Sequence, residues 1–118
     1  MAIEEGSSKH AAVNAYFELL PKHQLGPVLE LFSEDAIVWP SPMPVTGPIR
    51  GKHEIAKLYG EWLKVSMTFT KLLVHDSEHS SAVEIEVQIG PDKKIGHVVD
   101  VFDMTADGKI SRMAAYKR

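Results

Sequence analysis

One carboxyl group lies among apolar residues in the segment KIGHVVDVFDM, residues 94–104. If this segment is a β-strand, its side chains alternate between two faces, so Asp100 shares a face with Val98 and Phe102. A carboxyl group in such surroundings either pairs with a partner or is held in its neutral form. The segment alone favours a structural role, in a hydrogen-bonded core network or in an ion pair with Arg112 on the next predicted strand. The alternative is a functional carboxyl group in a binding site.

Histidines are the other candidates for chemistry. His75 and His79 flank Asp76 in a predicted turn, where a pair at this spacing is a weak signal for a metal site, and we interpret them as solvent-exposed. The sequence has no cysteine, which excludes disulfides, thiol catalysis and thiolate ligands. It also has no glycine-rich phosphate loop and no GxSxG, HExxH or EF-hand pattern. We therefore expect neither a metal nor a cofactor.

Composition indicates an ordinary globular protein. The 118 residues are expected to form a single domain, residues 1–118, because 44% are hydrophobic and 25% are charged. A net charge of −3 gives no electrostatic reason to expect nucleic acid or an anionic membrane as a partner. No apolar run is long enough to span a bilayer, and the first ten residues are too polar for a signal peptide. The expected location is cytoplasmic.

Three helices are predicted before the main run of strands. The first runs from a cap at Ser7 or Ser8 to Leu20, and Pro21 helps to end it. Pro27 suits the first turn of a short second helix, and a third helix covers about residues 52–65. Their apolar stripes are Val13, Tyr16, Phe17 and Leu20; Val28, Leu31 and Phe32; and Ile55, Leu58, Tyr59 and Trp62.

Strands account for most of the remaining chain. A short strand is predicted at residues 35–39, followed by an irregular loop at 40–51 with four prolines. Period-two alternation then predicts strands at residues 67–74, 82–89, 94–104 and 109–116, with Gly108 in the last turn. This order predicts an α+β fold in which helices cover one face of a mostly antiparallel sheet and enclose a pocket. The opposite face mixes polar and apolar side chains and is the expected dimer surface.

The order of elements and the segments FSEDAIVW, GKHEIAKLYGEWL and VVDVFDMTADGKISRM resemble the ketosteroid isomerase and SnoaL-like polyketide cyclase group. That group belongs to the nuclear transport factor 2-like superfamily. The resemblance covers nearly the whole chain. It implies a cone-shaped α+β fold, in which a curved, mostly antiparallel sheet and three N-terminal helices enclose a pocket.

The resemblance also implies roles for individual residues. Tyr16 matches the oxyanion-hole tyrosine of ketosteroid isomerase, Asp100 matches the carboxylic acid that donates the second hydrogen bond, and Tyr59 matches a tyrosine that supports the first. An aspartic acid kept neutral by an apolar site is the known arrangement in ketosteroid isomerase. The apolar face around Asp100 independently favours the neutral form here. The expected substrate-binding residues, which could equally be ordinary core residues, are Trp62, Phe102, Val98, Met113 and Trp39.

One position departs from the isomerase pattern. The general-base aspartate of that enzyme falls on Pro40, and proline cannot abstract a proton. His53 is a candidate replacement because imidazole titrates near neutral pH, although a surface position is favoured for it. Steroid isomerisation by the usual route is therefore not expected.

Two functions follow from these residues. The first is an isomerase, cyclase or dehydratase that binds an apolar cyclic ketone, polyketide or terpenoid intermediate and stabilises an oxyanion through Tyr16 and Asp100. The second is a non-catalytic small-molecule-binding or interaction module on the same fold, which the proline at position 40 favours. In both cases the partners expected are an apolar small molecule and a second copy of the chain.

Overall fold

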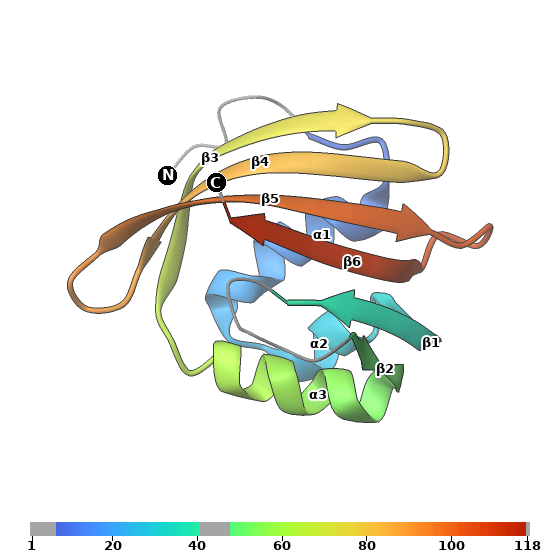
Figure 1. The fold of residues 1–118 in the computed structure, drawn as a ribbon, viewed down its shortest axis with the longest axis horizontal. Helices are drawn as coiled ribbons and strands as arrows, with labels where there is room; N and C mark the ends of the chain where they lie inside the picture. The colour runs from blue at the N-terminus through green and yellow to red at the C-terminus, as the bar shows by residue number, and fades with distance from the viewer. Residues whose placement is uncertain (1–6, 41–47, 118) are drawn as a thin grey trace.

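The computed structural model describes residues 7–40 and 48–117. Within them a six-stranded sheet curves over the helices, with the strand order β2-β1-β6-β5-β4-β3 (Figure 1). The elements in chain order are α1 (Ala11–Leu19), the 3₁₀ turn η1 (Leu20–Lys22), α2 (Leu25–Leu29), β1 (Phe32–Trp39), β2 (Ile49–Arg50), α3 (Gly51–Trp62), β3 (Met67–Asp76), β4 (Ser80–Ile89), β5 (Lys94–Met104) and β6 (Ile110–Lys117). The predicted α+β architecture is confirmed, and the parallel β1–β6 pair is the exception in an otherwise antiparallel sheet.

The first helix starts later than predicted. Neither Ser7 nor Ser8 caps it, because α1 begins at Ala11 with His10 at the N-cap position. Ser8 instead accepts a hydrogen bond from the His10 backbone N–H and donates one of 2.7 Å to the Asp76 carboxylate at the end of β3. The Lys9 backbone N–H donates to the same carboxylate at 2.7 Å. These contacts tie the start of the helix that carries Tyr16 to the sheet.

The second helix and the first strand also differ from the prediction. Helix α2 spans Leu25–Leu29 and contains Pro27 in its first turn, whereas Phe32 lies outside the helix and begins β1. Phe32 is nevertheless fully buried, as the apolar stripe predicted. The stripe therefore identified a core residue correctly but assigned it to the wrong element, because a short apolar run does not distinguish a helix end from a strand start.

Two residues of the predicted proline-rich loop form a short strand instead. Residues 41–47 of the expected loop lie outside the described residues, and Ile49–Arg50 pairs with β1 as the short strand β2. Helix α3 ends at Trp62, three residues before the predicted end at Val65. It packs against β1 and α2.

The four long strands are close to their predicted positions. The range of β5 is as predicted, whereas β3 and β4 extend further into the turn that joins them. Gly108 adopts the predicted positive φ, 88°, in the turn before β6. Along β4, Val83, Ile85 and Val87 are buried and the intervening glutamates are only partly covered, which confirms the predicted alternation.

The hydrophobic core lies between the helices and the concave face of the sheet. Its largest fully buried side chains include Tyr16, Tyr59, Phe32 and Phe102, whose rings meet edge to face or tilted. In the part of the chain that the structure describes, no helix combines the length and the apolar character needed to cross a membrane.

Candidate active site

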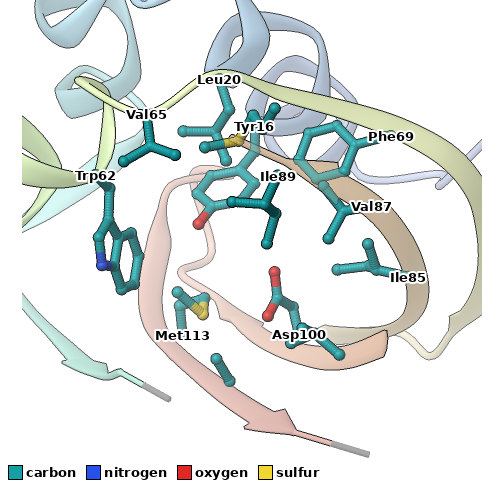
Figure 2. A pocket seen from close by; sticks show the side chains of 13 residues that line it. Tyr16, Leu20, Trp62, Val65, Phe69, Ile85, Val87, Ile89, Asp100 and Met113 are labelled. Carbon is teal, nitrogen blue, oxygen red and sulfur yellow. The ribbon is translucent and has the colours of Figure 1, made fainter. Parts of the chain in front are cut away.

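A cavity of about 240 Å³ opens between the concave face of the sheet and the helices (Figure 2). Helix α1 and the turn η1 form one wall, the end of α3 and the turn after it form a second, and strands β3 to β6 form the remainder. The residues that line it are Tyr16, Leu20, Trp62, Val65, Met67, Phe69, Ile85, Val87, Ile89, Val98, Asp100, Met113 and Ala115. Nearly all of them are apolar, so a polar group in this cavity meets little water.

Asp100 is the acidic group of this cavity. Strand parity turns its side chain to the concave face, where the residue is 7% exposed, and its carboxyl group points into the hollow (Figure 2). No hydrogen bond or ion pair to this carboxyl group forms among the described residues. Burial raises the pKa of Asp100 from 3.8 to about 7, because the apolar surroundings disfavour the charged form.

The structural role considered for Asp100, a core hydrogen-bond network or an ion pair with Arg112, is not observed among the described residues. Arg112, the partner considered from the sequence, lies opposite Asp103 in the β5–β6 register. Its guanidinium nitrogen is 3.6 Å from the Asp103 carboxylate. Because Asp103 and Asp100 are an odd number of residues apart, they occupy opposite faces of β5, and Arg112 is on the face away from the cavity.

Tyr16 brings a hydroxyl group to the same hollow from α1. Its side chain is 1% exposed, and its hydroxyl oxygen is 2.7 Å from that of Tyr59. Burial, the adjacent Tyr59 and the Asp100 carboxyl group all raise the pKa of Tyr16 well above 10. The phenol is therefore neutral at physiological pH. If Tyr59 is the donor in the shared hydrogen bond, the Tyr16 O–H is free to donate into the cavity.

Tyr59 lies behind Tyr16 and outside the cavity lining. It comes from α3, is fully buried, and packs edge to face on Trp62 with ring centroids 4.9 Å apart. Burial raises its pKa above 10, the hydrogen bond with Tyr16 opposes this shift, and the charge of Asp100 adds to it. Its position matches the supporting role implied by the resemblance, which stays a prediction.

The residues expected to bind substrate divide into two groups. Trp62, Val98 and Met113 line the cavity, whereas Phe102 and Trp39 do not. Phe102 is fully buried beneath Tyr16, with ring centroids 5.0 Å apart. Trp39 is 41% exposed on the convex face of the sheet, because its neighbour Val38 pairs with the inward-facing Met113.

Sequence reasoning missed most of the apolar wall. The inward positions of β4, namely Ile85, Val87 and Ile89, follow from the alternation that predicted the strand and could have been assigned to the pocket. Leu20 lies on the apolar stripe predicted for the first helix, whereas Val65 comes from the turn after α3, where no periodic pattern indicates which way a side chain points. Tertiary packing brings both side chains into the cavity lining.

Among the described residues of the cavity wall, no side chain replaces the general base that the isomerase pattern places at position 40. Pro40 is buried and His53 is exposed near the start of α3, and neither lines the cavity. Among the described lining residues, Asp100 and Tyr16 are the only ones with a titratable side chain. His75 and His97 are on the convex face, where they contact Glu84 and Glu86. No group of three metal-ligating side chains forms in the described ranges.

A family model described as a SnoaL-like domain matches residues 13–113. The chain belongs to the SnoaL-like family. The match includes Tyr16, Tyr59, Asp100 and Met113, and so covers the elements that build the cavity. No functionally curated protein matches this SnoaL-like domain significantly.

Solved structures share the fold of this SnoaL-like domain at low sequence identity. The epoxide hydrolase/cyclase-like enzyme SalBIII, which has a role in pyran ring formation in the polyether salinomycin, is 21% identical with a TM-score of 0.73. That alignment covers 91% of this chain and 88% of SalBIII. The canthaxanthin-binding Orange Carotenoid Protein of Anabaena (Nostoc) sp. PCC 7120 is 20% identical with a TM-score of 0.75. Here 99% of this chain aligns to only 38% of the longer protein.

The geometry defines what this SnoaL-like domain can do chemically. A phenol that stays protonated at physiological pH and a carboxyl group that is neutral below a pH of about 7 are directed toward one hollow with apolar walls (Figure 2). Hydrogen-bond donors in such a site stabilise a negative oxygen more strongly than water does, because they are already oriented and the local dielectric constant is low. A carboxyl group with a pKa near 7 can also exchange a proton at physiological pH.

Proposed function

We propose that this SnoaL-like domain is an enzyme that acts on an apolar cyclic ketone, polyketide or terpenoid intermediate and stabilises an enolate-like oxygen through Tyr16 and Asp100. The observation that carries this proposal is the Asp100 carboxyl group, which is buried, faces the cavity and has no hydrogen-bond partner in the described ranges. A carboxylic acid used only for structure would have its hydrogen bonds satisfied within the protein. A ligand oxygen is the partner that fits it.

The proposed chemistry uses Asp100 in its neutral form. Below a pH of about 7 the carboxylic acid donates a hydrogen bond to the substrate oxygen, and Tyr16 donates a second. A basic group of the substrate itself takes the proton that is lost, because the described lining holds no base besides Asp100. As negative charge then develops on the substrate oxygen, both hydrogen bonds strengthen, so the transition state gains more than the ground state. Isomerisation next to a ketone, aldol-type ring closure and loss of a hydroxyl group β to a ketone proceed through such an oxygen.

Asp100 is also the proposed proton exchanger. It can give its proton to a substrate oxygen and take one back later in the cycle, because its pKa lies close to the operating pH. His53 is exposed and outside the cavity lining, so we do not propose it as the base. Reactions that need one proton moved within the site, such as ring closure or loss of water, fit this arrangement best.

The rival function is a non-catalytic binding module. Pro40 at the position of the isomerase base favours it, and so does the fold shared with a carotenoid-binding protein. Both functions require the cavity to bind an apolar ligand. They differ in whether Asp100 and Tyr16 stabilise charge on that ligand.

A fluorescent naphthol distinguishes the two functions, because its neutral and ionised forms emit at different wavelengths. The wild-type protein is expected to bind it and to lower its apparent pKa, since both donors favour the naphtholate oxygen. Asp100→Leu is expected to abolish the shift and to weaken naphtholate binding by about tenfold or more, the effect of losing a hydrogen bond to a charged oxygen. Fluorescence titration across pH measures both quantities.

The matched control is Asp103→Asn, which changes an aspartate on the convex face of the same strand. It is expected to leave naphthol binding unchanged. If wild type and Asp100→Leu bind the two naphthol forms alike, the cavity does not stabilise charge and the catalytic proposal is wrong. Binding of the neutral form by both proteins would then support the non-catalytic module.

We also propose that two copies of the chain associate through the convex face of the sheet. Trp39, Leu73 and Tyr116 are exposed by 41%, 37% and 54%, and the strand register places them around the partly buried Val99 and Val101. An exposed apolar patch of this kind is typical of an interaction surface.

Trp39→Glu is expected to convert a dimer to a monomer, as measured by sedimentation velocity. A monomeric wild type would refute the proposal.

A further inference from the structure

The mouth of the cavity is lined by apolar side chains that face water. Val65 and Ile89 belong to the cavity lining yet are 40% and 41% exposed, whereas Tyr16 and Met113 at the inner end are each 1% exposed. The Gly90 backbone N–H donates to the Ser66 carbonyl at 2.9 Å, which holds the end of β4 beside the turn after α3. The opening is thus an ordered part of the structure between Val65 and Ile89.

The inner end and the mouth are far apart along the sheet. Asp100 pairs with Val83 on β4, and Ile89 lies six residues beyond Val83 on that strand. At about 3.3 Å per residue, this corresponds to roughly 20 Å along the strand. The wall between them is apolar, with Ile85 and Val87 contributed by β4 and Val98 by β5. The lining thus follows β4 and β5 from Asp100 to Ile89 and forms an apolar passage between them.

A glycine widens this passage near its mouth. Gly96 pairs with Val87 and has the same parity as Val98 and Asp100, so a side chain at this position would face the cavity. A Cβ atom there would lie 3.5 Å from the Ile89 Cδ1 atom and 3.6 Å from the Val87 Cγ1 atom. Alanine would therefore fit in ordinary contact, whereas a longer side chain would occupy the passage or displace Ile89.

We propose that the ligand of this cavity is amphipathic and elongated, with one oxygen at its inner end and a flexible apolar chain that leaves through the mouth. The position of the oxygen rests on the function proposed above, whereas the chain is inferred from the apolar passage. A chain that extends over Val65 and Ile89 would cover both side chains, and covering exposed apolar surface is favourable. A compact ring system confined to the inner end would leave both side chains in water.

A series of 4-alkylphenols, from 4-methylphenol to 4-octylphenol below their solubility limits, tests this proposal by isothermal titration calorimetry. Affinity is expected to rise by about two- to fourfold for each added methylene, the gain from removing a CH₂ group partly or fully from water, until the chain passes the mouth. Gly96→Leu is expected to make the affinity level off at a shorter chain. Ile89→Ser is expected to reduce the gain in affinity per methylene for the longest chains.

The matched control is Ile95→Ser, which changes an isoleucine that is 52% exposed and pairs with Gln88 on the opposite face. It is expected to bind the whole series like the wild type. An affinity that does not depend on chain length, or an equal loss in Ile89→Ser and Ile95→Ser, would overturn the proposal. Asp100→Leu tests the two proposals separately. If this variant binds 4-methylphenol like the wild type and still gains affinity with chain length, the function proposed above is wrong. The proposal of an elongated ligand is then supported.

Discussion

Replacing Asp100 with asparagine is expected to stabilise the protein by about 4 kcal/mol at about pH 8 and to change its stability little at about pH 4. Asparagine has nearly the same shape as a neutral aspartic acid but cannot ionise. Wild-type Asp100, by contrast, must either keep its proton or carry a charge in an apolar cavity. The comparison therefore measures how strongly the folded protein disfavours a charge at this position.

The sign follows from the direction of the pKa shift. The ordinary pKa of this carboxyl group is 3.8, and burial raises it to about 7 in the folded protein. Between these values the folded protein retains a proton that the unfolded chain has released, so the contribution of Asp100 to stability falls as pH rises. The loss begins near the unfolded pKa and is complete above the folded pKa. A difference of about three pKa units at 1.36 kcal/mol each gives the expected magnitude.

Urea unfolding of wild type and Asp100→Asn at several pH values between about 4 and 8 measures the difference. Subtracting the two curves removes the contributions of other titrating groups. Asp103→Asn is the control, because its carboxylate is 45% exposed and paired with Arg112. Parallel stability curves for wild type and Asp100→Asn would show that Asp100 is not held neutral, contrary to this account of the site.

A stabilising substitution at a candidate active site has a functional meaning. A buried carboxyl group without a partner lowers stability at neutral pH, and such costs concentrate where a protein needs a perturbed group for binding or catalysis. Asp100→Asn is therefore expected to be a more stable protein in which a proton donor has been replaced by an amide that cannot transfer a proton.

The second large effect is expected at Phe102. Phe102→Ala is expected to lower the free energy of unfolding by about 3 to 5 kcal/mol, because the ring is fully buried and its removal leaves a cavity beneath Tyr16 and Phe17. Trp62→Ala removes a larger side chain, but one that is only partly buried in the cavity wall. Its cost in stability is expected to be less than half as large.

Chemical unfolding and naphthol binding, measured on both variants, separate structural from ligand-contacting residues. Trp62→Ala is expected to weaken naphthol binding more than its loss of stability explains. If Phe102→Ala is too unstable to study, Phe102→Leu retains most of the apolar volume and is expected to cost less. A mild effect of Phe102→Ala combined with lost binding would place this ring in the cavity wall after all.

The inward orientation of Asp100 shows what local sequence pattern determines. The side chains of a strand alternate with a period of two regardless of what packs on them, so the pattern around residues 94–104 was enough to place Asp100, Val98 and Phe102 on one face. The same periodicity predicted four strands of the sheet, and the helical stripes identified Tyr16 and Tyr59 as buried. These predictions succeeded because each depends on neighbours along the chain.

The tertiary structure determines which of those residues line the cavity. Val98 and Phe102 share a face of β5, yet α1 covers Phe102 with Tyr16 and leaves Val98 open to the cavity. Trp39 looked suitable for binding an apolar ligand, but the parallel register of β1 with β6 turns it to the convex face. Val65 comes from the turn after α3, where no periodic pattern predicts the direction of a side chain.

The sequence by itself therefore determined the fold class, the inward carboxyl group and the two tyrosines, because alternation and helical stripes are local properties of the chain. Only the tertiary structure decided where the cavity lies, that Arg112 pairs with Asp103, and that the mouth is lined by exposed apolar residues. The physical reason is that a cavity is space left unfilled between elements. Its walls depend on how distant segments pack together.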